Sequence, residues 1–138
     1  MAEKKKLRLR AHFGKIAAIM IAAFAVMLAL DLILKHFAFK DAWEFTVIPN
    51  VIWVKEERNF GAAFSFLSGT SWGKIFLIVL TFILLIAIIF VFIILPERFV
   101  ILKLVLAMMA AGALGNLIDR LAFGYVRDFV YLNMLFSS

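Results

Sequence analysis

The sequence predicts an all-α integral membrane helical bundle that carries a small strand-rich element outside the membrane. Its 138 residues are 66% hydrophobic and 17% charged, whereas a soluble domain is about 45–50% apolar and about 25% charged. A domain this small buries only part of its surface, so much of the apolar material must face lipid. Three long apolar runs provide most of it. We therefore interpret residues 1–138 as a single membrane domain.

The chain opens with a basic segment, residues 1–15, which holds six lysines and arginines and one acid. A basic run directly before an apolar segment favours a cytoplasmic N-terminus. The total charge of +6 would suggest nucleic acid in a soluble chain, but the basic residues do not alternate with stacking aromatics. We expect membrane lipids as partners and no nucleic acid.

The first apolar run, residues 16–34, is broken only by Asp31. A secretory signal peptide is the competing interpretation, because it too has a basic start followed by an apolar run. This run is longer than the usual core of about 7–15 residues, and no A-x-A-like cleavage site follows it. We therefore predict a first transmembrane helix.

Two further runs predict the second and third transmembrane helices. Residues 75–95 contain Thr81 as their only polar side chain, and a helix of this length crosses a hydrocarbon core of about 30 Å. Residues 99–118 carry Lys103 near the start and Asn116 near the end. A lysine so placed can extend toward the nearby interface, so it does not exclude a span.

With the N-terminus inside, residues 36–74 and 119–138 lie outside the membrane. Residues 43–54 are rich in β-branched and aromatic side chains, and residues 64–67 are similar, which predicts strands. We expect a strand-rich element on the membrane surface, with tryptophans suited to the interface: Trp43, Trp53 and Trp72.

Polar side chains near or within these spans are candidate functional residues. Asp31 and Lys35 are four residues apart and share a helix face, although an interfacial ion pair would also explain them. Asn59 precedes two small residues, Gly61 and Ala62, which permit close approach of a second backbone or a ligand. A turn capped by the asparagine is the simpler alternative there.

The most informative stretch, AAGALGNLIDRLAFGYVRDF, spans the end of the third run. Asn116, Asp119 and Arg120 share one face of the predicted helix, and Asp128 follows a turn allowed by Gly124. Helix packing with a charged collar is the simpler explanation, but a collar does not require two carboxylates, an amide and a guanidinium at one depth. A partly desolvated carboxylate there suits proton transfer near neutral pH.

The sequence argues against several kinds of active site. It contains no cysteine and only two histidines, His12 and His36. A thiolate nucleophile, a zinc cluster and a haem are therefore not expected.

Two motifs closely resemble the lipoprotein signal peptidases, or signal peptidase II: NFGAAFSFL at residues 59–67 and AGALGNLIDRLAFGYVRDF at residues 111–129. The spacing of Asp31 and Lys35 also resembles the family's D-x-x-x-K pattern. The resemblance implies an aspartic endopeptidase of the bacterial cytoplasmic membrane with four transmembrane helices. Such enzymes remove signal peptides from diacylglyceryl-modified prolipoproteins.

The resemblance also assigns roles. Asp128 matches the first catalytic aspartate of a pair that shares a proton, in which one carboxylate activates water and the other polarises the scissile carbonyl. This chemistry needs no metal or cofactor. The other matches are substrate-lining or supporting positions: Asp31, Lys35, Asn59, Gly61, Ala62, Asn116, Asp119 and Arg120.

The sequence departs from the family pattern after Asp128, where no further acid occurs. The family's second catalytic aspartate lies in an F-N-x-A-D motif at the start of a fourth helix. We favour a truncated member over one in which Asp119 replaces that aspartate, because the shared-proton chemistry needs both carboxylates. A third helix that lacks its partner is expected to self-associate.

The leading hypothesis is thus an enzyme of the signal peptidase II type. The alternative is a truncated, inactive paralogue that binds lipoprotein precursors or lipid without cleaving them. A small transporter or channel subunit ranks third, because an ion path needs polar residues at mid-membrane and the second run offers only Thr81.

Overall fold

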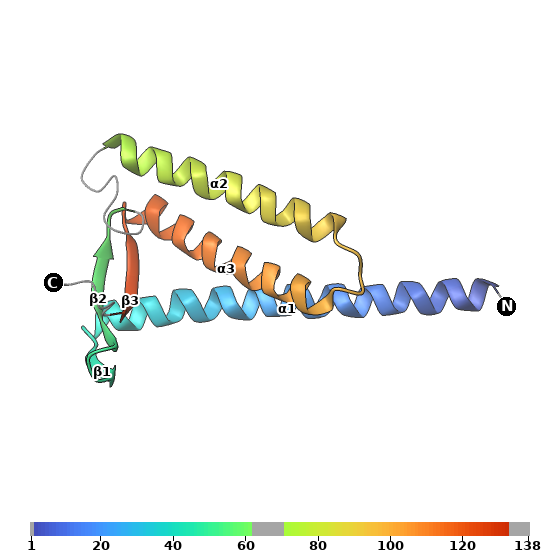
Figure 1. Ribbon diagram of the computed structural model, residues 1–138, viewed down its shortest axis with the longest axis horizontal. Coiled ribbons are helices and arrows are strands. Elements are labelled where there is room, and N and C mark those ends of the chain that lie inside the picture. The colour runs from blue at the N-terminus through green and yellow to red at the C-terminus, as the bar shows by residue number, and fades with distance from the viewer. Residues whose placement is uncertain (1, 62–70, 133–138) are drawn as a thin grey trace.

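The computed structural model describes residues 2–61 and 71–132. Three long helices run along the molecule: α1 (Ala2–Lys40), α2 (Ser71–Ile94) and α3 (Val100–Ala122). A small sheet lies across one end of the helical bundle (Figure 1). Each helix is long and apolar enough to cross a membrane. The predicted membrane bundle with a small strand-rich element is confirmed.

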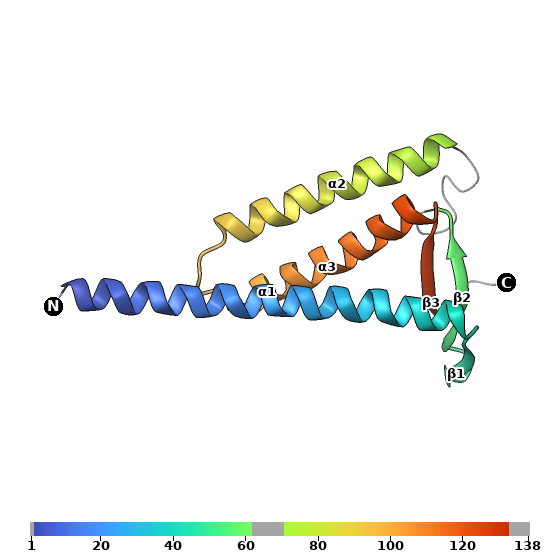
Figure 2. The same ribbon diagram turned by 180° about the vertical axis from the view of Figure 1, so that it is seen from behind.

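Helix α1 begins before the predicted first span, residues 16–34, and ends after it. Its span-forming part is Gly14–Lys40. The basic segment before it consists largely of residues that favour helix and contains no proline, so the helix continues through it. Figures 1 and 2 show this part projecting beyond the ends of α2 and α3. At its other end residues 36–40 are helical, which corrects the strand-rich segment predicted over residues 36–74.

Helices α2 and α3 also exceed the predicted runs, because a helix in lipid satisfies its own backbone hydrogen bonds and persists until a turn residue intervenes. Residues 71–74 are helical instead of strand-rich. Helix α3 continues past residue 118 to Ala122, which places Asp119 within the helix. It ends before Gly124, whose φ of +86° lies in the left-handed region that favours glycine.

The sheet has three antiparallel strands in the order β1-β2-β3. Strands β1 (Glu44–Ile48) and β2 (Ile52–Asn59) form a hairpin, which confirms strands in the segment before the second helix. The third strand, β3 (Val126–Leu132), follows α3 and pairs with β2; it was not predicted. Residues 64–67, also predicted to form a strand, lie outside the described residues.

A tight turn sets the hairpin. The backbone N–H of Val51 donates to the carbonyl of Ile48 at 3.0 Å, with Pro49 and Asn50 at the centre. The φ of Asn50 is +59°, a value that asparagine tolerates better than most side chains. These residue types therefore specify the turn locally.

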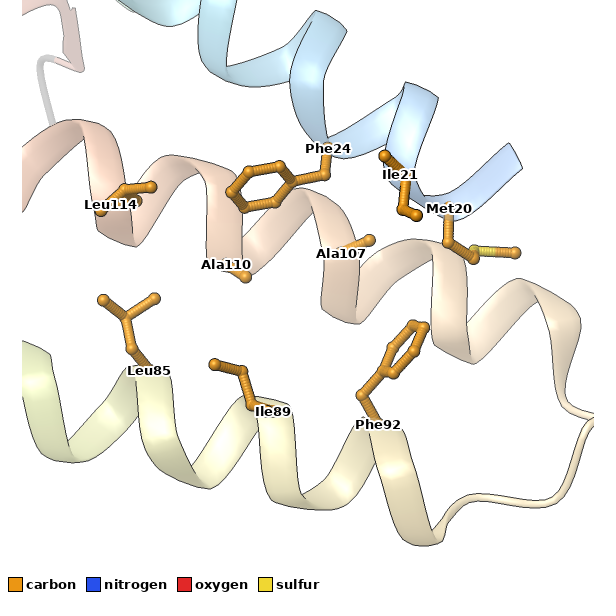
Figure 3. A pocket seen from close by; sticks show the side chains of 9 residues that line it. All are labelled: Met20, Ile21, Phe24, Leu85, Ile89, Phe92, Ala107, Ala110 and Leu114. Carbon is orange, nitrogen blue, oxygen red and sulfur yellow. The ribbon is translucent and has the colours of Figure 1, made fainter. Parts of the chain in front are cut away.

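Helix α3 lies between α1 and α2 and contacts both (Figure 2). Small buried side chains on α3, such as Ala107 and Ala111, let the helices approach closely. A wholly apolar cavity of about 350 Å³ opens between the three helices (Figure 3), bounded at one end by Phe92 and floored by alanines of α3. Most large apolar side chains on the outside of α1 and α2 are exposed, as lipid-facing surfaces are.

The end of the bundle far from the sheet is joined by the α2–α3 turn. Lys103 is 3% exposed, and its ammonium lies 2.7 Å from the Glu97 carboxylate and 5.0 Å from the centre of the Phe92 ring. The lysine therefore pairs within the protein at the turn instead of extending freely to the interface. This pair fastens the start of α3 to the end of α2.

Candidate active site

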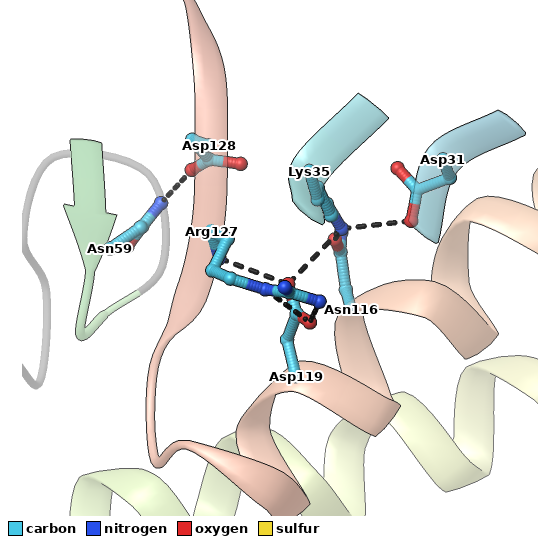
Figure 4. A network of polar contacts seen from close by, with 7 residues as sticks. All are labelled: Asp31, Lys35, Asn59, Asn116, Asp119, Arg127 and Asp128. Carbon is cyan, nitrogen blue, oxygen red and sulfur yellow. Dashed lines mark hydrogen bonds and ion pairs between the residues drawn. The ribbon is translucent and has the colours of Figure 1, made fainter. Parts of the chain in front are cut away.

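A cluster of charged side chains lies where α1 and α3 meet the sheet (Figure 4). Lys35 occupies its centre and is 2% exposed. Its ammonium donates to Asn116 Oδ1 at 2.8 Å and lies 2.9 Å from Asp31 Oδ2 and 3.4 Å from Asp119 Oδ2. Asp31 and Lys35 thus form the pair that their spacing predicts, and the same lysine joins α1 to α3.

Asp119 is completely buried and binds Arg127 at the start of β3. The arginine Nε and Nη2 donate to Asp119 Oδ1 at 3.0 and 2.7 Å, and the Arg127 backbone N–H donates to Oδ2 at 3.0 Å. One helix carboxylate therefore holds both the main chain and the side chain of a strand residue.

The buried cluster is electrically balanced. Two cations, Lys35 and Arg127, face two anions, Asp31 and Asp119. Buried charges are tolerated in a membrane protein when they are paired and hydrogen-bonded, because each unpaired ion carries a large desolvation penalty. The pairing thus explains why four charges lie together at the end of an apolar bundle.

Glycine provides the room for this cluster. A Cβ atom at Gly115 would overlap the carboxylate of Asp31, whereas one at Gly112 would meet no atom within 4 Å. Of the two glycines on this part of α3, only Gly115 is required by a close approach. The approach is to a side chain of α1, not to its backbone.

Asp128 lies on β3 next to Arg127 but points elsewhere, since successive side chains on a strand alternate between its faces. Asn59 Nδ2 donates to Asp128 Oδ2 at 3.0 Å, and Asn59 Oδ1 accepts from the backbone N–H of Gly61 at 3.0 Å. The other oxygen of Asp128 makes no hydrogen bond within the part of the chain that the structure describes. Asp128 is half-buried and stands outside the balanced cluster.

Arg120 faces another direction. Adjacent helix residues do not face each other, and it is Arg127, not Arg120, that pairs with Asp119. Arg120 lines a cavity of about 230 Å³ between α2 and α3 together with Asn116 and Thr81, and leucines form most of the remaining wall. Among the described residues it forms no ion pair, so the expected grouping of Arg120 with the acids is only partly realised.

The structure therefore brings most of the predicted residues to one end of the bundle. Asp31, Lys35, Asn116 and Asp119 form the buried cluster, while Asn59, Gly61 and Asp128 meet at the sheet. Ala62 lies outside the described residues.

Sequence reasoning missed two residues of this site, Arg127 and Glu57. The register of β2 and β3 places Glu57 opposite Asp128, and its half-exposed carboxylate lies 3.7 Å from the Lys55 ammonium. A strand prediction over residues 126–132 would have revealed Arg127, because alternation separates its side chain from that of Asp128. Among the described residues no group of three histidines, cysteines or acids is arranged to hold a metal ion.

Comparison with known proteins identifies the family. The sequence model of the signal peptidase (SPase) II family matches residues 23–138. The chain belongs to this family. Its match to signal peptidase II begins inside α1 and includes every residue of the site described above.

Individual relatives agree with this assignment. A lipoprotein signal peptidase of Acinetobacter baumannii is 40% identical over 87 residues, which are 62% of this chain and 49% of the relative. Another, from Staphylococcus aureus, is 35% identical over 120 residues, 85% of this chain and 71% of the relative. The chain thus spans about half the length of the Acinetobacter baumannii relative.

Solved structures show the same fold. A bacterial membrane enzyme determined by the in meso method at 2.3 Å resolution superposes with a TM-score of 0.73 at 31% sequence identity. The match covers 85% of this chain and 71% of that enzyme. The likeness therefore extends to the arrangement of helices and sheet in a signal peptidase II family member.

Proposed function

We propose that the protein is an endopeptidase that removes signal peptides from diacylglyceryl-modified prolipoproteins, with Asp128 as a catalytic aspartate. Family membership supports the class of reaction. The observation that carries the residue assignment is the Asn59–Asp128 hydrogen bond, which fixes a half-buried carboxylate beside the balanced cluster. The free oxygen of Asp128 is then available to a water molecule.

The chemistry follows from that geometry. Ionised Asp128 takes a proton from water as the water oxygen attacks the scissile carbonyl carbon. A second carboxylic acid donates a hydrogen bond to the carbonyl oxygen and protonates it. When the carbon–nitrogen bond breaks, the proton on Asp128 passes to the leaving amine. The Asn59 amide orients Asp128 throughout by donating to its other oxygen.

The second carboxylic acid is the open role. Asp119 receives three hydrogen bonds from Arg127 and the charge of Lys35, and protonating it would weaken all of them. We therefore assign Asp119 a supporting role. Glu57 is the acid that the sheet register sets opposite Asp128, and its only ion pair among the described residues is the long one with Lys55.

A second candidate function is precursor binding without cleavage. It is favoured by the same observation, because every acid of the buried cluster is engaged and Asp128 stands alone outside it. In that case the site would hold the precursor peptide near Asn59 and Asp128 and leave it intact. Membrane lipids are proposed partners in both cases, through the exposed apolar faces of α1 and α2.

The deciding experiment is cleavage of a purified diacylglyceryl-modified prolipoprotein in detergent by the parental chain, Asp128→Asn and Asp41→Asn. Asp41 is an exposed acid between α1 and β1, so its variant controls for the loss of one carboxylate. We expect the parent and Asp41→Asn to cleave and Asp128→Asn to be inactive. Cleavage by Asp128→Asn at the parental rate would refute the assignment, and precursor binding without cleavage by the parent would establish the second candidate.

Two further variants identify the partner acid. We expect Glu57→Gln to abolish cleavage if Glu57 supplies the proton, while Asp119→Asn lowers the amount of folded protein. An unchanged rate in Glu57→Gln would exclude Glu57. Both variants are compared per mole of folded protein.

We propose that the N-terminus is cytoplasmic, so that the sheet and Asp128 lie on the opposite side. The chain has no cysteine, so single introduced thiols report the orientation cleanly. A membrane-impermeant thiol reagent should label Asp41→Cys but not Arg98→Cys, a turn position, in intact cells. The reverse pattern would invert the topology. We also propose self-association in detergent, which a monomeric mass by light scattering would contradict.

A further inference from the structure

Arg127 connects the balanced cluster to the strand that carries Asp128. Its side chain is 12% exposed and faces an Asp119 side chain that is not exposed at all. The guanidinium donates twice to one oxygen of Asp119, and the backbone N–H of the same residue donates to the other. Paired hydrogen bonds of this kind define direction as well as distance.

Strand β3 needs such an anchor because it is an edge strand. In the order β1-β2-β3, only β2 supports it within the sheet. The bonds to Asp119 attach its first residues to α3 on the other side. Asp119 also lies 3.4 Å from Lys35 of α1, so the strand is tied to two helices.

Resting on the proposed function, we propose that Arg127 is a positioning residue for Asp128. It holds the start of β3 against α3, and the next residue along the strand is thereby held against Asn59. The rate of a reaction that depends on a fixed carboxylate is sensitive to small displacements, since a shift of about 1 Å costs roughly 100-fold. Arg127 acts through the strand and touches neither water nor substrate.

The sheet offers a matched control. Arg58 lies opposite Arg127 in the register of β2 and β3, but its side chain is 58% exposed and pairs only with Glu56 among the described acids. The test uses Arg127→Met, which removes the donors, Arg127→Lys, which keeps the charge, and Arg58→Met. All are made in the full chain and assayed on the diacylglyceryl-modified prolipoprotein.

We expect Arg127→Met to lower kcat roughly 10- to 100-fold while KM stays within about twofold, because orientation of the carboxylate and not precursor binding is impaired. Arg127→Lys should recover part of the rate, since an ammonium supplies the charge but not the two-donor geometry. Arg58→Met should match the parent. Equal kcat values for Arg127→Met and Arg58→Met would overturn the proposal, as would a loss confined to KM.

Amide hydrogen exchange separates this inference from the proposed function. In Arg127→Met the amides of β3 should exchange at least about tenfold faster than in Arg58→Met, with α2 unchanged as an internal reference. If the parent does not cleave but this difference is present, the proposed activity fails and the anchoring of β3 stands. Identical exchange of β3 in the two variants refutes the anchoring whatever the activity.

Discussion

The two ends of the bundle bury charge in different ways. At the α2–α3 turn one lysine, Lys103, pairs with Glu97, a residue whose side chain is 40% exposed. At the sheet end Lys35 lies among three acceptors on two helices, and Arg127 adds a second buried cation from the sheet. The first arrangement joins neighbours along the chain. The second joins α1, α3 and β3, which are distant in sequence.

The difference shows what the charges at each end are for. A pair at a turn can hydrate if it is broken, because one partner already reaches solvent. A buried cluster cannot, so removing one member leaves an uncompensated charge. The sheet end therefore carries a larger energetic risk, and that risk is found where Asp128 and Asn59 must be held in place.

The largest effect is expected from Lys35→Met. The change leaves two buried carboxylates without their shared cation and should lower the free energy of unfolding by about 3–5 kcal/mol. Lys55→Met, which breaks a surface pair, should cost less than about 1 kcal/mol. Unfolding in detergent at increasing denaturant measures both. Equal midpoints for the two variants would mean that the cluster contributes nothing beyond a surface pair.

A smaller effect is expected from the glycines of α3. Gly115→Ala forces a Cβ atom into the Asp31 carboxylate and should destabilise the protein by about 1–3 kcal/mol. Gly112→Ala meets no neighbour and should be neutral or stabilising by up to about 1 kcal/mol, because alanine favours helix. The sign of the difference between the two melting temperatures is the test. A more stable Gly115→Ala would show that Asp31 does not need this space.

The smallest effect is expected at the turn. Lys103→Met removes one ion pair and one cation–π contact, and Glu97 can then hydrate. We expect a loss of about 1–2 kcal/mol with no change in cleavage per mole of folded protein. A loss as large as that of Lys35→Met, measured in the same denaturant series, would remove the distinction between the two ends.

Much of the fold could be predicted from the sequence because it depends on local patterns. The three spans follow from their apolar length, and the Asp31–Lys35 pair follows from helical spacing. The ends of the helices were less accessible. Nothing in the basic segment stops α1, and α3 continues through Asp119 until Gly124 allows a turn.

The remaining part of the site depends on long-range pairing. The partnership of Arg127 with Asp119 requires β3 to start directly after the turn and to pair with β2, which residues 119–138 alone do not indicate. Glu57 acquires its place opposite Asp128 in the same way. Sequence reasoning assigned the guanidinium of the site to Arg120, whereas adjacent helix positions point apart and Arg127 supplies the pair.

The most direct test of the division between the two ends is the cleavage rate per mole of folded protein for Asp128→Asn and Lys103→Met, measured side by side with the parent. We predict that Asp128→Asn folds as the parent does and does not cleave, while Lys103→Met is less stable and cleaves at the parental rate. Parental cleavage by Asp128→Asn, or an inactive but folded Lys103→Met, would contradict the conclusion that the chemistry belongs to the sheet end alone.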